Sequence, residues 1–442
     1  MKPKSAWPLA KRVEFAVGQF NSADGWMEPG RLRHSTTACD GTEMDDPTQI
    51  QRDGVNVGPL VSFVVPCYNL AHLLSECVMS ILAQSFPDFE ILIMDNCSPD
   101  NTREVARSFH DPRVKHIRNP VNLGHICNFN KGITMSRGKY VWLISADDFL
   151  RSPNVLARFV DLMERRPDVG YAFCRSVELQ EGKELGVARF DYGNVDRVWD
   201  GPAFLARLIR CNCIAQSSGM VRKECYDRVG LFPLDMPHAG DWYLWCLMAL
   251  HYRVAYFSEP MVSCRVHDQS LTNLLNREEA AVCLMDELNV LWRVRSQAEL
   301  AGMPFLRRAC DRSIAYRAAR SLHCGPSRGG RTGLSPADFE AILYSHVADA
   351  NDKKNIQALI HTSLGDEQYW QGEYRQASRS YWVGLKLRPW RLKTWTKCIL
   401  MGTGAFGIAA RQLFYQLRRS SATSARAGRI EKVADLKRTM LN

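Results

Sequence analysis

The stretch Leu60-Val-Ser-Phe-Val-Val65, followed by Pro66-Cys-Tyr-Asn69, decides the fold of this chain. The first six residues form a short, mostly β-branched run that a proline closes, which is typical of a buried parallel strand. Apolar residues then recur at helical spacing from Leu74 to Leu82, before Phe86-Pro87 interrupts them. The pattern predicts a strand followed directly by a helix.

The same alternation repeats up to residue 144. We expect further strands at residues 89–94, 114–117 and 140–144, a helix at 126–135, and a helix from Pro99 to about Phe109 that Ser98 caps. Strands and helices alternate at the spacing of βαβ units. The sequence therefore predicts an α/β fold with a mostly parallel sheet flanked by helices, whose ligands bind beyond the carboxyl ends of the strands.

The pattern weakens through residues 182–200 and resumes with helices expected at 203–210 and 239–250, the second with Asp241 at its start. Residues 273–442 have helical periodicity, and the spacing of Gly365, Ala377, Tyr381 and Pro389 resembles one tetratricopeptide-like hairpin. We expect a polar, partly disordered leader at 1–58, an α/β domain at 59–272, and a helical basic region at 273–442.

The positive charge is concentrated at the end of the chain. The net charge is +10, and residues 371–442 hold fifteen Lys and Arg against three Asp and Glu. Such a tail suits an anionic lipid surface, a nucleic acid or simply water, but no nucleic-acid motif accompanies it, so no nucleic acid is expected as a partner.

Other features favour a cytoplasmic protein. There is no apolar run of about 20 residues and no secretory signal, so no transmembrane helix is expected. The 15 cysteines are scattered inside expected core elements, as in a reducing compartment. Cys211-x-Cys213 lacks the second half of a zinc site, which disfavours zinc.

Three polar clusters directly follow apolar runs: Pro66–Asn69, Asp95–Ser98 and Ser145–Asp148. Sheet geometry should bring them together. Asp147 and Asp148 offer the hard oxygen ligands that Mg²⁺ or Mn²⁺ takes when it also holds phosphates, although such a pair also suits a helix cap. No glycine-rich dinucleotide motif and no P-loop follows the first strand, which disfavours Rossmann dinucleotide binding and P-loop hydrolysis.

Two further residues are candidates for chemistry. Asp241 is placed to remove a proton from an incoming hydroxyl, or alternatively to favour the start of its helix. His267 is a candidate imidazole ligand for the same metal ion, or a structural histidine.

The order of these motifs resembles the family 2 glycosyltransferases, which have the GT-A fold, over about residues 60–272. Ile93-Met-Asp-Asn-Cys-Ser98 is similar to their Asp-Asp-Gly-Ser turn, and Trp142–Asp148 to the approach to their metal-binding Asp-x-Asp. Gly240-Asp241-Trp242 resembles their Glu-Asp motif, and Arg265-x-His267 their closing segment. Ser145, Asn96, Phe129 and Gly240 depart from the family pattern at positions that are often charged.

The resemblance implies a role for each candidate residue. Pro66, Tyr68, Asn69, Asp95 and Asp147 would line the nucleotide. Asp147, Asp148 and His267 would hold Mg²⁺ or Mn²⁺, and Asp241 would be the catalytic base.

The function that the resemblance implies is inverting transfer of a hexose from a nucleotide sugar, with a UDP-sugar favoured, to a hydroxyl of a glycan or lipid-linked acceptor. The expected role is synthesis of a surface polysaccharide or glycolipid, with residues 390–419 as a peripheral contact at the inner face of the membrane. One alternative is a catalytically degenerate, transferase-like scaffold or interaction protein. A nucleotidyltransferase would need a glycine- and lysine-rich loop after the first strand, which is absent.

Overall fold

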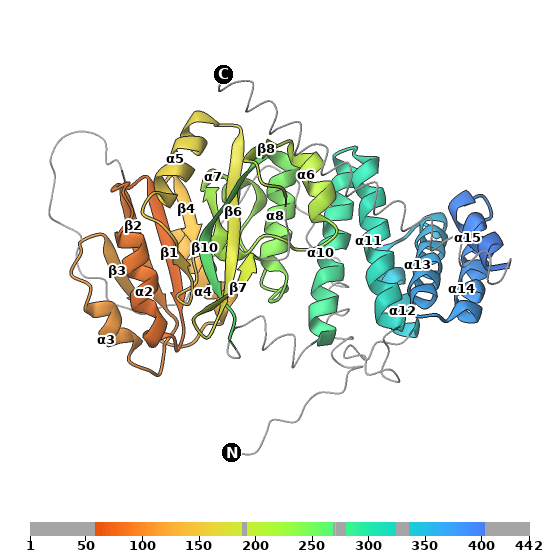
Figure 1. Ribbon diagram of the computed structural model, residues 1–442, viewed down its shortest axis with the longest axis horizontal. Helices are drawn as coiled ribbons and strands as arrows, with labels where there is room; N and C mark the ends of the chain where they lie inside the picture. Colours follow the sequence, from red (N-terminus) through yellow and green to blue (C-terminus); the bar gives the residue numbers. More distant parts are fainter. Residues whose placement is uncertain (1–57, 188–191, 268–269, 271–279, 324–335, 403–442) are drawn as a thin grey trace, which may run out of the picture.

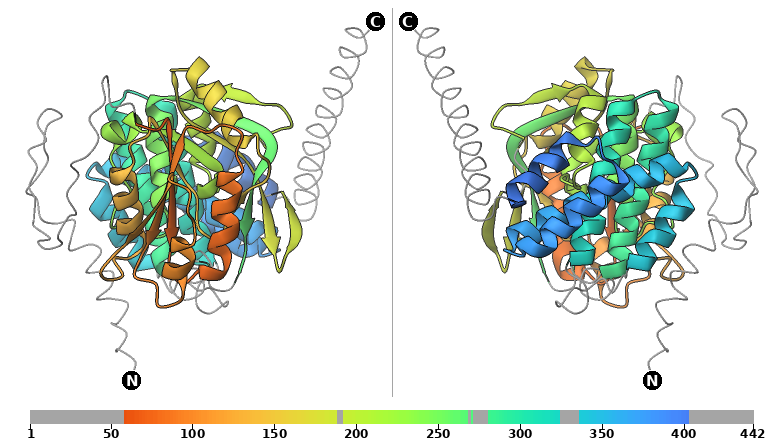
Figure 2. Two further views of the ribbon diagram at one scale, coloured as in Figure 1. Left: turned by 90° about the vertical axis from the view of Figure 1, so that its left-hand side faces the viewer. Right: turned by 90° about the vertical axis from the view of Figure 1, so that its right-hand side faces the viewer.

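The molecule places a mixed sheet and a stack of helices side by side along its longest axis (Figure 1). The structure is a computed structural model and describes residues 58–187, 192–267, 270, 280–323 and 336–402. Figure 2 shows the two ends, with the sheet and α2 facing the viewer in one view and the C-terminal helices in the other.

The sheet has a parallel half and a mixed half. Its strand order is β3-β2-β1-β4-β9-β6-β10-β5, with β7 beside β6 and β8 beside β10. Strands β3, β2, β1 and β4 are parallel, and β9 runs antiparallel to both β4 and β6. The strands in chain order are β1 (Val61–Cys67), β2 (Phe89–Asp95), β3 (Val114–Arg118), β4 (Tyr140–Leu143), β5 (Phe149–Leu150), β6 (Val169–Gln180), β7 (Lys183–Val187), β8 (Arg197–Trp199), β9 (Gly219–Arg222) and β10 (Arg253–Arg265).

Helices cover both faces of the sheet because alternate strand residues are apolar on both sides. Phe63 and Val65 of β1 pack in one hydrophobic cluster with α2 (Ala71–Leu82), α3 (Thr102–Arg107) and α5 (Val155–Arg165). Val64, between them, packs in a second cluster on the other face. That cluster contains residues of α4 (His125–Met135), α6 (Gly201–Leu208), α7 (Glu224–Val229) and α8 (Gly240–His251).

The second cluster continues without a break into the C-terminal helices. Leu288, Ile314, Phe339 and Ile356 belong to it together with Trp242 of α8. The helices there are α10 (Ala280–Leu300), α11 (Pro304–His323), α12 (Pro336–His346), α13 (Ala350–Trp370), α14 (Tyr374–Leu387) and α15 (Leu392–Gly402). The helical region therefore shares one hydrophobic core with the sheet.

The expected tetratricopeptide-like hairpin corresponds to α13 and α14. Tyr381 of α14 lies against Gly365 of α13, and a Cβ atom at Gly365 would meet the Tyr381 ring at 2.5 Å. A glycine at this position therefore lets the two helices approach closely. The α/β fold with a mostly parallel sheet, flanking helices and this helical C-terminal region is confirmed.

Several local expectations were wrong. The helix after β2 begins at Thr102, not Pro99, because Asp100 accepts hydrogen bonds from the N–H groups of both Thr102 (3.1 Å) and Ala71 (3.0 Å). Ser98 does not cap that helix, and its hydroxyl instead accepts from the N–H of Asn69 at 3.1 Å. Residues 182–200 contain β7 and β8, and the next helix covers 201–208 instead of 203–210.

Some expectations concern residues outside the described ranges. The leader lies there up to residue 57, as do the expected boundary between 272 and 273 and the chain beyond 402. These domain boundaries stay predictions. In the part of the chain that the structure describes, no helix is both long enough and apolar enough to cross a bilayer.

Candidate active site

The carboxyl ends of β1, β2 and β4 bring the three polar clusters together. Cys67, the last residue of β1, pairs with Asp95, the last residue of β2. On the other side of β1, the chain after β4 continues alongside it, since the N–H of Ala146 donates to the Pro66 carbonyl at 3.2 Å. With neighbouring strands about 4.8 Å apart, the segment Pro66–Asn69 lies between Asp95 and Asp147.

Asp95 is a fully buried and strongly bonded carboxylate. One oxygen accepts from the N–H of Ser98 at 2.8 Å, and the other accepts from Arg118 at 2.5 Å and lies 3.3 Å from His116 Nε2. Burial alone would raise the pKa of Asp95, but the hydrogen bonds from Ser98, Arg118 and His116 outweigh it and lower the pKa. Asp95 is therefore an ionised acceptor held in one orientation.

The turn after β1 exposes two of the candidate nucleotide residues. Tyr68 keeps 48% of its surface exposed, and Asn69 is exposed as well. Asn69 has φ of 58°, in the left-handed region that Asn and Gly tolerate best. Pro66 is buried in β1. The turn thus presents Tyr68 and Asn69 to solvent directly beside Asp95.

A network of asparagines that we did not expect supports the same edge. Asn119 donates to Asn96 (3.0 Å) and Asn128 (2.8 Å), and Asn96 donates to Asn122 (2.8 Å). Asn128 in turn donates to the Met94 carbonyl at 2.8 Å. The sequence does contain the pairs Asn122-Leu-Gly124 and Asn130-x-Gly132, which mark this region, but not their pairing.

Asp147 and His267 are brought into direct contact. His267 Nε2 lies 3.0 Å from Asp147 Oδ2, and the hydrogen bond that His267 donates to this carboxylate raises the pKa of His267. Asp148 is turned into the protein and accepts from the N–H of Arg265 at 2.9 Å. Burial, and then the charge of Asp147, raises the pKa of Asp148 to about 7.

The side chains around Asp147 suit a divalent cation only if a bound substrate also coordinates it. Across the described ranges, no group of three or more His, Cys, Asp or Glu side chains is arranged to hold a metal ion. Asp147 and His267 nevertheless place one carboxylate and one imidazole together. Mg²⁺ and Mn²⁺ commonly take one or two protein carboxylates and complete their shell with water and substrate phosphates.

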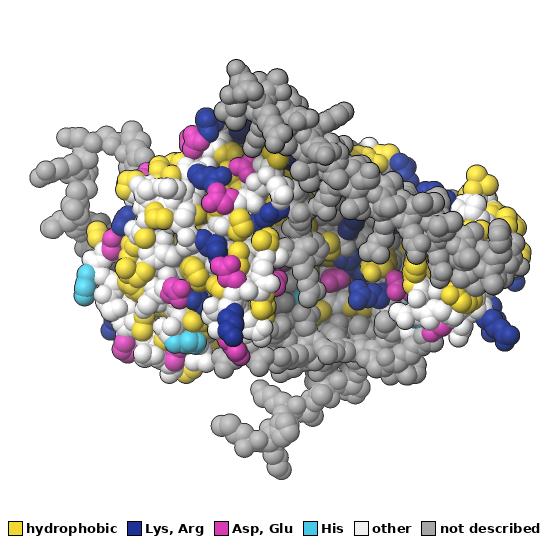
Figure 3. Space-filling view, viewed as in Figure 1, with side chains coloured by type: hydrophobic (Ala, Val, Ile, Leu, Met, Phe, Trp, Pro, Cys, Tyr) yellow, Lys and Arg dark blue, Asp and Glu magenta, His cyan; other side chains and the backbone are white. Residues whose placement is uncertain are grey.

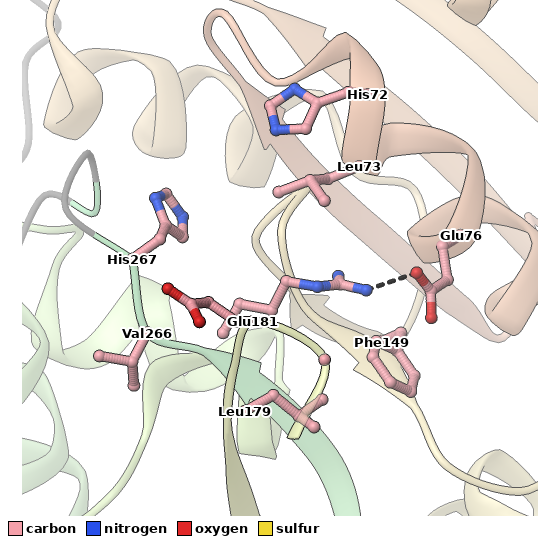
Figure 4. Close-up of a pocket in the computed structure, with 10 residues that line it drawn as sticks. His72, Leu73, Glu76, Phe149, Leu179, Glu181, Val266 and His267 are labelled. Carbon is pink, nitrogen blue, oxygen red and sulfur yellow. Dashed lines mark hydrogen bonds and ion pairs between the residues drawn. The ribbon is translucent and has the colours of Figure 1, made fainter. Parts of the chain in front are cut away.

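A pocket of about 700 Å³ opens beside this pair (Figure 4). Figure 4 shows His267 and Glu76 on opposite sides of it, and Arg265 forms an ion pair with Glu76 across the space between. The Arg265 guanidinium also lies 4.9 Å from the centre of the Phe149 ring. The lining residues come from α2, β5, the β6–β7 turn and the end of β10: His72, Leu73, Glu76, Phe149, Leu179, Glu181, Gly182, Arg265, Val266 and His267.

Asp241 stands apart from the Asp147–His267 pair, at the first turn of α8. Its carboxylate accepts from Asn212 Nδ2 at 2.9 Å and from the N–H of Trp242 at 2.6 Å. Burial raises the pKa of Asp241, and these hydrogen bonds only partly oppose the rise.

The segment from Asn212 to Ser217 connects the partner of Asp241 with the Asp147 cluster. Ser217, five residues after Asn212, accepts from the N–H of Ser145 at 3.1 Å, and Ser145 begins the Asp147 cluster. Five residues span at most about 17 Å, which limits how far Asn212, the partner of Asp241, lies from the Asp147 cluster.

Residues 62–227 match the family model described as glycosyl transferase family 2. The segment from β1 to α7 is therefore similar to family 2 glycosyltransferases. This confirms the resemblance drawn from the strand-end motifs. The match ends before α8, so Asp241 and His267 lie beyond the segment that carries it.

Named relatives support the same family. An uncharacterized glycosyltransferase of Haemophilus influenzae is 27% identical over 230 residues, covering 50% of this chain and 70% of the relative. The abequosyltransferase RfbV of Salmonella typhimurium is 28% identical over 238 residues, covering 48% of this chain and 68% of its own.

The fold of the glycosyltransferase domain and its helical extension also has a solved counterpart. The structure of Staphylococcus aureus TarS residues 1–349 in complex with UDP-GlcNAc aligns with a TM-score of 0.53 at 17% identity. The alignment covers 71% of this chain and 92% of that structure. The similarity extends past residue 272 and confirms the GT-A fold.

Proposed function

We propose that this glycosyltransferase is inverting and metal-dependent, and moves a hexose from a nucleotide sugar, a UDP-sugar by preference, to a hydroxyl of a glycan or lipid-linked acceptor. The observation that carries the proposal is the division of the site. Asp95 lies at one strand end and Asp147 contacts His267 beside the next, whereas Asp241, with a raised pKa, begins α8 and is connected to them through the Asn212–Ser217 segment.

The donor half of the site has the chemistry that a nucleoside diphosphate requires. We assign the ionised Asp95, which lies buried at the strand end, to the recognition of the base or ribose, while Tyr68 supplies an exposed ring and Asn69 an exposed amide. Pro66 is buried in β1 between the strands that lead to Asp95 and Asp147. The nucleotide is therefore held by side chains and strand edges instead of a glycine-rich loop.

The diphosphate half involves Asp147, His267 and Asp148. We assign Asp147 and His267 as the ligands that present their atoms to an ion, with Asp148 as the buried carboxylate that adds negative charge behind them. A bound Mg²⁺ or Mn²⁺ stabilises negative charge on the departing diphosphate. Arg265 contacts both residues, because its backbone N–H donates to the Asp148 carboxylate and its guanidinium donates to the Asp147 backbone carbonyl.

Asp241 is the base that removes the proton from the acceptor hydroxyl. Burial raises its pKa towards the range in which a carboxylate accepts a proton more readily. In this proposal the acceptor lies between Asp241 and the donor, and its hydroxyl attacks the anomeric carbon from the face opposite the diphosphate. Such a displacement forms one bond, breaks one bond, and inverts the centre without a covalent intermediate on the protein.

The acceptor is proposed to be a surface polysaccharide or glycolipid, met by a cytoplasmic enzyme at the inner face of the membrane. Support comes from the end of the helical region, where residues 374–402 contain seven Lys and Arg and no Asp or Glu. In the same part, Trp390 (69%), Leu392 (77%) and Ile399 (61%) are exposed. Figure 3 shows hydrophobic and basic side chains side by side at this end of the molecule. Tryptophan and basic side chains together suit a lipid interface.

The competing proposal is a degenerate, transferase-like scaffold that acts through its helical region. It requires no nucleotide and no base. The fully buried carboxylate of Asp95 disfavours it, because a buried charge without a function is costly to keep.

Thermal-shift measurements with UDP, GDP and their sugar nucleotides, each with Mn²⁺, Mg²⁺ or EDTA, test the proposal. We expect UDP with Mn²⁺ to raise the melting temperature, because a ligand that binds the folded state stabilises it by mass action. Asp241→Asn should keep this shift and lose about 10²- to 10⁴-fold in UDP release from the sugar nucleotide that gives the largest shift.

The matched control is Asp235→Asn, an exposed aspartate near the start of α8 that pairs with Arg293. It should change neither quantity. Full turnover by Asp241→Asn would refute its role as the base, and the absence of any nucleotide shift in the wild-type protein would favour the scaffold.

A further inference from the structure

Helix α11 of the C-terminal region contacts both the start of α8 and the turn at residues 209–210, which follows α6. Ser313 of α11 donates from its hydroxyl to the Ile209 carbonyl at 2.8 Å, and Arg317, one turn later, donates to the Arg210 carbonyl at 3.2 Å. The Arg317 guanidinium also lies 4.8 Å from the centre of the Trp242 ring. One side chain of the helical region therefore touches both the 209–210 turn and the residue next to Asp241.

Arg317 is itself fixed in place. It is 8% exposed, and its guanidinium donates to Glu287 of α10 at 2.6 Å and to the Ser313 hydroxyl at 2.6 Å. An arginine with three acceptors and a ring beneath it has little freedom to change conformer. It is therefore a rigid support for the carbonyl that it holds.

Helix α10 holds the other side of the same loop. Asp286, which is 3% exposed, accepts from the N–H of His238 at 2.8 Å. His238 is three residues before Asp241. The segments before and after the candidate base are thus both attached to the C-terminal helices.

The 209–210 turn leads directly to Asn212, whose side-chain amide donates to Asp241 at 2.9 Å. We infer that Asn212 and Arg317 are positioning residues for Asp241: Arg317 fixes the turn at residue 210, and Asn212 then orients the carboxylate towards the acceptor. This inference rests on the proposed role of Asp241 as the base.

Asn212 has an electrostatic as well as a geometric role. Burial raises the pKa of Asp241, and the Asn212 amide is the first of the contacts that lower it. The other charged or titratable groups near this carboxylate are His238 in the preceding loop, Cys246 on α8, and the Arg317–Glu287 pair from α11 and α10. Among the contacts that lower the pKa of Asp241, only the Asn212 amide bonds an oxygen from another segment of the chain.

The test measures the pKa of Asp241 directly, which does not require the natural substrates. The side-chain carboxyl of the labelled full-length protein is titrated by ¹³C NMR, and Asp241→Asn assigns the resonance. Asn212→Ala should raise the pKa by about one unit, a tenfold change, because one hydrogen bond to a charged group is lost. Arg317→Met should shift it in the same direction, since the turn that presents Asn212 is released.

Arg295→Met is the matched control. Arg295 is another buried arginine, 6% exposed, and its partners Asp311, Asp352 and Glu299 all belong to the helical region. Its loss should lower the melting temperature and leave the pKa of Asp241 unchanged. If Arg317→Met does not fold, Ser313→Ala is used instead. It removes only the hydrogen bond to the Ile209 carbonyl and should raise the pKa of Asp241 by a smaller amount.

Kinetics with the sugar nucleotide that gives the largest thermal shift supply a second measurement. Asn212→Ala should lower kcat about tenfold with the KM for the donor unchanged, because only the acceptor side is affected. An unchanged Asp241 pKa in Asn212→Ala, or equal shifts in Arg317→Met and Arg295→Met, would overturn the inference. Full turnover by Asp241→Asn would instead overturn the role of the base, and the NMR result would stand separately.

Discussion

Replacing Glu90 by Gln should destabilise the folded protein in a pH-dependent way. Glu90 lies in β2 and is 2% exposed, and its carboxylate joins three neighbouring segments. It accepts from Ser62 of β1 (2.8 Å), from Lys115 of β3 (2.9 Å), and from the backbone and guanidinium of Arg137 (3.0 and 2.8 Å) before β4. Glutamine keeps the shape of the side chain and removes its charge.

The size of the effect follows from the pKa of Glu90. Burial alone would raise this pKa, but the hydrogen bonds from Arg137, Lys115 and Ser62 outweigh burial and lower it from 4.5 to about 2. One pKa unit corresponds to about 1.4 kcal/mol, so the ionised form contributes at most about 3.5 kcal/mol at neutral pH. Arg137 and Lys115 are themselves 55% and 44% exposed, and screening by solvent reduces the expected loss to about 2 kcal/mol.

The sign of the pH dependence is fixed by the lowered pKa. The contribution is fully present above the unfolded value near 4.5 and disappears as the pH falls towards 2. Urea unfolding followed by circular dichroism should therefore show a gap of about 2 kcal/mol between wild type and Glu90→Gln at pH 7, and a much smaller gap at pH 3.

Glu164→Gln is the control for Glu90→Gln. Glu164 also pairs with a lysine, Lys139 at 2.7 Å, but its side chain is 41% exposed. Its replacement should cost less than about 1 kcal/mol. A gap for Glu90→Gln that is the same at pH 7 and pH 3, or no larger than the gap for Glu164→Gln, would refute the assignment of the stabilisation to the buried charge.

Two further predictions concern ligands. Asp147→Ala should weaken UDP binding in calorimetry only when Mn²⁺ or Mg²⁺ is present, and equal binding by the wild-type protein in EDTA and in Mn²⁺ would contradict the metal role. In flotation assays, the full-length protein should bind anionic but not neutral vesicles, and the binding should weaken as salt rises. The double variant Trp395→Ser, Ile399→Ser should lose most of this binding, whereas Leu300→Ser, which removes a more exposed apolar side chain elsewhere, should not.

The donor side of the site could be predicted from the sequence because its order follows from local patterns. Asp95 and Asp147 each come directly after a strand-length apolar run, and parallel strands bring such residues to one edge. The spacing of the runs was enough to place both residues at that edge. Their roles in binding remain predictions.

The support of Asp241 could not be predicted in this way. Asn212 is 29 residues from Asp241, and Arg317 is 107 residues from the carbonyl of Arg210 that it holds. Neither belongs to a periodic motif, and both contacts depend on how α11 packs on the sheet domain. An asparagine in an irregular segment and an arginine on a helix have the same local pattern whether they face solvent or a carboxylate.

The short antiparallel strands β9 and β5 were also missed for a physical reason. Strand β9 has four residues and β5 has two, and runs this short carry no measurable alternation. The start of α3 was misplaced because Asp100 bonds to the N–H of Thr102 and so competes with an earlier helix start. In both cases, contacts made by the folded chain outweighed the local preference.

Helix α8 has almost no surface of its own: nine of its residues are buried, among them Trp242 and Met248. One side of the helix packs on the sheet and the other packs on α10 and α11, so the sequence of α8 must fit both surfaces. The helical region is thus not a module that recombination can exchange freely between relatives. A chimaera that takes its acceptor-side helices from another glycosyltransferase would need α8 from that same enzyme, and the natural crossover point lies before Gly240.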